Sequence, residues 1–209
     1  MIDTNYARTM ARYDRWQNQS LMTAADKMTD KERWTDRGAF FGSIAETLNH
    51  ILWDHHVWLA RQRGDTVTAA ETSARHPYTD APRNWADYKN QRHALDTEIR
   101  IWCDSLTDAD VSKKVQWIRG DTPVTTDFGF NLVHMFNHAT HHRGQVHAML
   151  TGAGIDPGST DLPMLPEVSE QGQATLAKPK ANMSASVLRA RPVPQKNPRR
   201  TYKHTPQRA

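Results

Sequence analysis

Residues 129–151 read GFNLVHMFNHATHHRGQVHAMLT and carry the strongest structural signal in the chain. Their apolar residues recur at intervals of three and four, which predicts an amphipathic helix with one buried face. Gly152 and Gly154 follow, and glycine commonly ends a helix. The segment also holds five histidines within fourteen residues, namely His134, His138, His141, His142 and His147. We therefore expect a helix that supplies both part of a core and a group of imidazoles.

Three other segments show helical periodicity, at about residues 6–27, 43–63 and 84–105. The second has the clearest ends, because Ser43 and Glu46 have the spacing of a capping box and Gly64 follows the last turn. Four amphipathic helices predict an all-α fold, a four-helix bundle whose apolar faces meet in a shared core.

The segments between the helices predict how the helices are connected. Residues 65–83 contain two prolines and no sustained periodicity, and they are numerous enough for the next helix to pack away from its predecessor. We therefore predict a long crossover between the second and third helices. Residues 114–119 and 122–126 are β-type runs separated by Gly120-Asp121, which predicts a small β-hairpin before the fourth helix.

Composition limits the class of protein. A chain of 209 residues with 37% hydrophobic residues fits one domain with a sizeable core. Cys103 is the single cysteine, so an intramolecular disulfide is excluded, and the first residues lack the apolar core of a signal peptide. No apolar run is long enough to cross a bilayer. These features predict a cytoplasmic protein that does not enter membranes.

Basic residues concentrate at the C-terminal end of the chain. Residues 166–209 hold nine Lys or Arg against two Glu and so carry +7, which leaves −3 on residues 1–165 out of a net +4. This end is rich in Pro, Ala, Ser and Gln and has one aromatic residue, Tyr202. Such a segment buries too little apolar surface to offset its ordering entropy. We predict a bundle at 1–165 and a disordered basic tail at 166–209.

His138 and His142 are the best candidates for metal ligands on the fourth helix. Residues four apart share a helix face with Cβ atoms about 5–6 Å apart, so two imidazoles there can converge on one ion. Both border the apolar stripe of that helix, whereas His134 and His141 lie further toward solvent. Zinc-type ions take three protein ligands in catalytic sites and four in structural ones, so a further donor is required.

His50 is the best candidate for the third ligand. It occupies the middle of the second helix beside the apolar stripe, and Asp54 follows one turn later. His55 lies within the stripe and His56 on another azimuth, and either replaces His50 if the helix is rotated. The ligands alone do not identify the metal, because imidazole suits zinc, nickel, iron, cobalt and copper, and manganese also stays open.

The fourth helix resembles the last helix of a known family. Residues 137–147 read NHATHHRGQVH, with a histidine, three residues and then His-Arg-Gly-Gln, and Asp161-Leu162-Pro163 follows after Gly154. Leu48-Asn49-His50 with Trp53-Asp54 is similar to an earlier histidine segment of the same family. Over about residues 4–165 the chain resembles the DinB (damage-inducible, DinB/YfiT-like) family.

This resemblance implies a four-helix bundle with a long crossover that is usually dimeric. It implies a nickel, zinc or similar ion held by His50, His138 and His142, the set that spacing also favours. Members of the family include thiol-dependent transferases and isomerases that use low-molecular-weight thiols such as bacillithiol or mycothiol. The family name records induction by DNA damage, a stress response, and does not indicate DNA binding.

The leading functional hypothesis is a metal-dependent enzyme, a hydrolase or a thiol-dependent transferase acting on a small molecule. Three neutral imidazoles leave the ion's charge uncompensated, so a bound water is acidified toward a pKa of about 7, and a thiol is activated similarly. Asp54 is expected to orient His50 or act as a base through water, and Gln145 to lie on the metal-side face. Arg143 either pairs with an acidic substrate group or holds the bundle together.

Two other classes of function compete with this hypothesis. A non-catalytic metal-binding stress-response protein fits if a fourth protein ligand closes the site. The basic tail, with Arg199-Arg200 and Lys203, is compatible with a nucleic-acid or membrane-surface arm, although such clusters usually only aid solubility. The mildly acidic body argues against nucleic acid as a partner.

Overall fold

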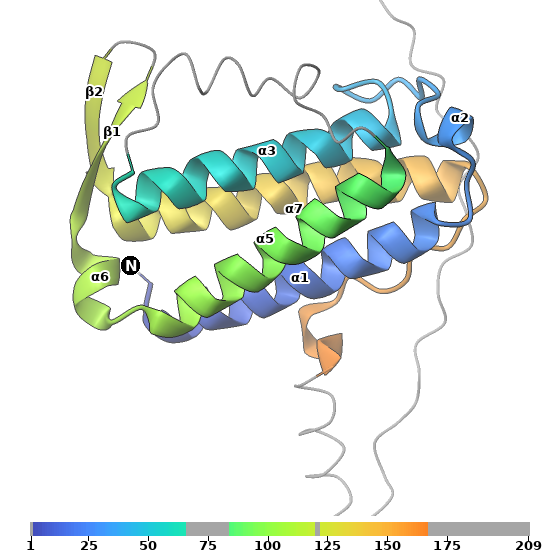
Figure 1. The fold of residues 1–209 in the computed structure, drawn as a ribbon. Coiled ribbons are helices and arrows are strands. Elements are labelled where there is room, and N and C mark those ends of the chain that lie inside the picture. Colours follow the sequence, from blue (N-terminus) through green and yellow to red (C-terminus); the bar gives the residue numbers. More distant parts are fainter. Residues whose placement is uncertain (1, 66–83, 120–121, 167–209) are drawn as a thin grey trace, which may run out of the picture. The chain divides into compact units, whose positions relative to one another are not determined.

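The computed structural model describes residues 2–65, 84–119 and 122–166 (Figure 1). Within this part, four long helices form the predicted bundle: α1 (Thr4–Ala25), α3 (Ile44–Arg63), α5 (Trp85–Ser105) and α7 (Phe128–Gly152). The smaller elements are α2 (Asp30–Arg33), α6 (Asp108–Ser112), β1 (Lys114–Arg119), β2 (Thr122–Asp127) and the 3-10 helix η1 (Leu162–Met164). None of the described helices has the length and apolar character that a membrane span needs.

The four helices pack around one core in a defined order. Helix α1 packs against α5 and α7, and α3 packs mainly against α7 and less extensively against α5. Figure 1 shows α1 and α7 running in one direction and α3 and α5 in the other. Because α3 and α5 are parallel, the chain between them has to cross over, as predicted. Residues 66–83 of that connection lie outside the described residues.

Helix α3 begins and ends where the sequence indicates. The Ser43 side chain accepts a hydrogen bond from the Glu46 amide, and the Glu46 carboxylate accepts one from the Ser43 amide at 3.1 Å. This capping box satisfies donors that would otherwise be unpaired at the start of the helix. The helix ends at Gly64, whose φ of +83° is a conformation that residues with a Cβ rarely adopt.

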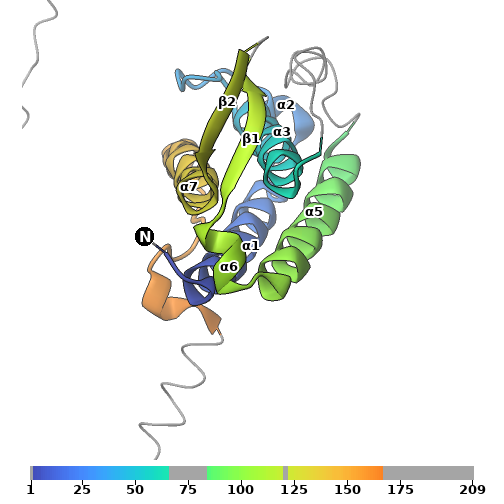
Figure 2. The same cartoon turned by 90° about the vertical axis from the view of Figure 1, so that its left-hand side faces the viewer.

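The predicted hairpin is present and is anchored to the bundle (Figure 2). Strands β1 and β2 pair antiparallel, with Trp117 opposite Val124. The Trp117 ring lies 5.3 Å from the ring of Trp58 on α3. The Arg61 guanidinium lies over both rings, 4.8 Å from Trp58 and 4.4 Å from Trp117. The hairpin is therefore held on α3 by aromatic and cation–π contacts.

A buried polar network crosses the core of the bundle. Arg92 on α5 is fully buried, and its Nη2 lies 2.8 Å from Oδ1 of Asp96 one turn away. Its Nη1 lies 3.0 Å from Nδ1 of His55, a fully buried residue of α3. Asn18 of α1 donates to Asp96 at 2.9 Å. Charges and polar groups buried in this way require such partners, so the network fixes how the helices face one another.

The network continues to α7 through Arg143. Its guanidinium forms a buried ion pair with Asp14 of α1, and Asn18 donates to the same Asp14 carboxylate at 3.0 Å. Burial by itself raises the pKa of Asp14, but Arg143, His55 and Arg92 outweigh that effect, and the net pKa is lowered. Asp14 therefore stays ionised at the centre of the bundle.

Acid is expected to destabilise the metal-free protein through His55. Burial lowers the pKa of His55 from 6.5 to about 4, so the unfolded chain binds more protons than the folded one between these values. The free energy of unfolding should then fall by about 3 kcal/mol as the pH drops through this window. Urea unfolding at stepped pH measures the slope.

The control for this prediction is His55→Asn, whose amide oxygen can replace Nδ1 as the acceptor for Arg92. The difference in slope between wild type and this variant isolates His55 from the other histidines. Equal slopes would show that His55 does not titrate as its burial requires.

Candidate metal centre

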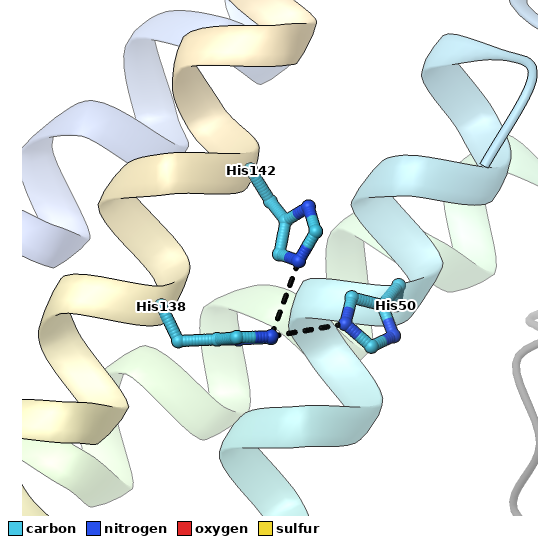
Figure 3. A group of neighbouring side chains, drawn as sticks. All are labelled: His50, His138 and His142. Carbon is cyan, nitrogen blue, oxygen red and sulfur yellow. Dashed lines mark hydrogen bonds between the residues drawn. The ribbon is translucent and has the colours of Figure 1, made fainter. Parts of the chain in front are cut away.

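Three histidine side chains meet between α3 and α7 (Figure 3). His138 and His142 lie one turn apart on α7, and His50 faces them from the middle of α3. Nε2 of His138 lies 3.3 Å from Nε2 of His50 and 3.1 Å from Nε2 of His142. The ligand atoms of all three histidines lie within 4.8 Å of one another. One nitrogen from each ring is therefore directed at a common centre.

The Nδ1 atoms of two of these rings have oxygen atoms close by. Oδ2 of Asp54 lies 3.1 Å from Nδ1 of His138, and Oε1 of Gln145 lies 2.8 Å from Nδ1 of His142. The hydrogen bond to Gln145 favours the His142 tautomer with its proton on Nδ1, which leaves its Nε2 with a bare lone pair. Asp54 lies beside His138 without forming a hydrogen bond to it. At 3.1 Å, Nε2 of His138 can donate a hydrogen bond to the lone pair of His142, and when both nitrogens are unprotonated a cation can bind between them.

The spacing of the nitrogens fits a transition metal. Metal–nitrogen bonds of about 2.0–2.1 Å at a tetrahedral angle place the two nitrogens about 3.3 Å apart. The two measured separations, 3.1 and 3.3 Å, agree with that value. Within the described part of the chain the group contains these three histidines and neither a cysteine nor a carboxylate. The donor set therefore fits an ion that keeps a coordination position for another ligand.

The site is dry on one side and accessible on the other. His50 and His142 are buried, whereas the His138 side chain keeps 23% of its surface exposed. The ring of Phe41 stacks on His50 with centroids 4.0 Å apart and lies 5.3 Å from the ring of His142. The Trp53 ring also lies near His50, with centroids 5.6 Å apart. Aromatic rings thus exclude water around His50, while His138 offers a route to solvent.

A tight turn before α3 positions Phe41. The Gly42 amide donates to the Ala39 carbonyl at 2.8 Å, and Gly42 has a φ of +76°. A Cβ at Gly42 would lie 3.0 Å from the Glu46 carboxylate that caps α3. The turn therefore requires glycine both for its conformation and for its close approach to the cap. Nothing in the sequence pattern indicated that Phe41 would contact the histidines.

Burial also prepares His142 for metal binding. Burial lowers the pKa of His142, and the hydrogen bond to Gln145 offsets only part of that effect. A lowered pKa keeps this imidazole neutral at pH 7, and neutral imidazole is the form that binds metal ions.

The structure brings together most of the residues that the sequence singled out. Asp54, which the sequence led us to expect as a partner of His50 or as a base through water, reaches across to α7, where its Oδ2 lies 3.1 Å from Nδ1 of His138. His55 is in the core network and outside the cluster. Arg143 forms an ion pair with Asp14 in the core. This contact fits a role in holding the bundle together, which was one of the two roles predicted for Arg143.

Removing the acceptor on His142 is expected to weaken metal binding. Gln145→Leu leaves Nδ1 of His142 without its partner, and the loss of such outer contacts typically costs about 10–100-fold in metal affinity. Competition titration against a chromogenic chelator measures the change. His141→Ala is the matched control, because it removes the other contact of Gln145, at 3.4 Å, and leaves His142 intact. Equal affinities for wild type and Gln145→Leu would show that this contact does not position the ring.

The comparison with models of protein families agrees with the geometry of the site, whereas the search of curated proteins adds nothing. A comparison with curated proteins returned no matching relative. The family model described as the DinB family matches residues 1–175, which include all four long helices and all three histidines. The chain therefore belongs to the DinB family.

Proposed function

We propose that the protein binds one divalent transition metal ion through His50, His138 and His142 and acts as a metal-dependent enzyme, either a hydrolase or a thiol-dependent transferase. The observation that carries the proposal is the convergence of three Nε2 atoms. It is supported by Gln145, which hydrogen-bonds Nδ1 of His142, and by Asp54, whose Oδ2 lies 3.1 Å from Nδ1 of His138. When bound, such an ion is a Lewis acid that lowers the pKa of a water or thiol at its remaining position.

The surrounding residues have separate roles in this proposal. The three imidazoles bind the ion, Gln145 maintains the His142 tautomer that binding requires, and Asp54 places a negative charge beside His138. Phe41 and Trp53 exclude water around His50, which strengthens electrostatic interactions in the site. The exposed edge of His138 is where a small substrate or a low-molecular-weight thiol would approach.

Metal content tests the first half of the proposal. We expect elemental analysis of purified protein, after reloading with zinc or nickel, to show about one ion per chain, as one three-histidine site requires. Zinc and nickel are the preferred ions, with iron, cobalt, copper and manganese as the alternatives to titrate. His93→Ala on α5, an exposed histidine remote from the cluster, is the control for adventitious binding. A chain that retains none of these ions would overturn the proposal.

Activity of the loaded and stripped forms tests the second half. Both forms are assayed for hydrolysis of activated esters and for transfer of a small thiol to an electrophile. We expect turnover only with metal and its return on reloading. Loaded protein that is no faster than the free ion would instead favour the non-catalytic candidate, a metal-binding stress-response protein.

The proposal extends to assembly and to the C-terminal end. We propose a homodimer, which light scattering of the full chain tests directly. We also propose that the bundle ends near residue 165 and that residues 166–209 form a separate basic tail, of which residues 167–209 lie outside the described part of the chain. Deleting 166–209 and measuring DNA affinity against salt tests the nucleic-acid alternative, and unchanged or absent binding would end it.

A further inference from the structure

A cavity lies at the end of the bundle where α2 and the first turns of α3 and α5 come together. Figure 1 shows these elements at that end of the bundle. It has a volume of about 150 Å³. Its walls include three aromatic residues, Trp34, Trp85 and Tyr88, and the rings of Trp85 and Tyr88 stack with centroids 5.1 Å apart. Trp34 is 49% exposed, so the cavity has access to solvent beside it. A volume of this size holds one six-membered ring.

Asn49 lines this cavity, and its side chain makes no hydrogen bond within the described part of the chain. The residue is 94% buried. An amide that lines a cavity can both donate to and accept from a molecule bound there. Asn49 precedes His50 on α3, but the two side chains belong to different sites. Asn49 lines a cavity together with residues of α5, whereas His50 faces α7. The metal centre therefore does not account for this amide.

Tyr88 adds a second polar group to the same cavity. It is buried, and its hydroxyl likewise makes no hydrogen bond with a described residue. Burial raises the pKa of Tyr88, so the hydroxyl keeps its proton at neutral pH and can donate. Asn49 offers both a donor and an acceptor. Two polar groups that line one aromatic cavity indicate a ligand with a polar edge and a flat body.

The charged residues at the cavity are already paired. Arg33 donates to the carbonyls of Ala25 and Met28, and its Nη2 lies 2.6 Å from Oδ1 of Asp30. Its guanidinium also lies 4.7 Å from the Trp85 ring centroid. The cation and the carboxylate therefore neutralise each other and leave no net charge for a charged ligand. This favours an uncharged occupant.

We propose that this cavity is a binding site for a small uncharged aromatic ring that carries a carboxamide or an equivalent donor–acceptor edge. The edge pairs with the Asn49 amide, the Tyr88 hydroxyl bonds a further acceptor, and the ring lies among the aromatic walls. The site is separate from the metal centre and does not depend on the function proposed for it.

Titration of the full-length protein with benzamide and nicotinamide, followed by NMR chemical shifts, tests the proposal. We expect saturable binding with a Kd of about 1 mM or tighter for molecules of this size. Asn49→Leu should weaken it at least tenfold, Tyr88→Phe severalfold, and His138→Ala not at all. Asn90→Leu, at an exposed position of α5, is the matched control. Benzoate and benzylamine are the charged comparators.

A second measurement separates recognition from folding. Because no described residue bonds the Asn49 amide, Asn49→Leu should leave the Tm of the ligand-free protein no lower than that of Asn90→Leu. A lower Tm for Asn49→Leu would assign this amide to the fold and overturn the proposal. So would the absence of saturable binding by both amides up to their solubility limits, an unchanged Kd in Asn49→Leu, or tighter binding of either charged comparator.

Discussion

His138→Ala is expected to lose metal binding almost completely. His138 is the shared member of the cluster, with Nε2 at 3.3 Å from that of His50 and 3.1 Å from that of His142. Four-ligand zinc sites provide about 10–16 kcal/mol, so one ligand supplies about 3–4 kcal/mol. Its loss corresponds to a decrease of about 100- to 1000-fold in affinity. Isothermal titration with zinc and with nickel measures this difference.

The same substitution should remove the stabilisation that metal gives to the folded protein. At a metal concentration 100 times the Kd, wild type gains about 2.7 kcal/mol. For a protein of this size that corresponds to about 5–10 °C in Tm. The control is His134→Ala, which removes an exposed histidine one turn earlier on α7. If His138→Ala bound zinc as tightly as this control, His138 would not be a ligand.

The fold was largely predictable because local signals marked the long helices. The Ser43 cap, the Gly64 stop and the β-type runs around Gly120 are all properties of short segments, and each appears in the structure where the sequence places it. Helices α2 and α6 were not predicted, because four or five residues are too few to show a helical period. Their capping boxes, at Thr29 with Glu32 and at Thr107 with Asp110, were the only available signals.

The metal centre was predictable in part, because its ligands come from two helices. Helical spacing relates His138 to His142 directly, but His50 is 88 residues from His138, and only the packing of α3 on α7 brings them together. Helical azimuth could place Asp54 on the correct face, but it could not say which imidazole Asp54 would reach. Phe41 enters the site from a turn, where no periodicity exists to reveal it.

Arg143→Met is expected to give the largest loss of stability, although Arg143 lies next to the metal ligand His142. The substitution keeps the length of the side chain and removes the charge that pairs with the buried Asp14. Removing one partner of a buried ion pair costs about 3–5 kcal/mol, because the remaining charge is left unpaired in the core. For a protein of this size the expected fall in Tm is about 6–20 °C. Calorimetry of the metal-free protein measures it.

Two further measurements distinguish this structural role from contact with a substrate. The pKa of Asp14 is lowered in the folded protein, so its pairing contributes stability above the unfolded pKa of about 3.9, and that contribution is lost as the pH falls through the lower folded value. Arg143→Met should therefore differ from wild type most at neutral pH and least in strong acid. The double variant Arg143→Met with Asp14→Leu removes both charges and should recover much of the lost stability. A residue that served only to bind substrate would leave Tm unchanged and raise KM, and that pattern would reverse the assignment of Arg143 to the core.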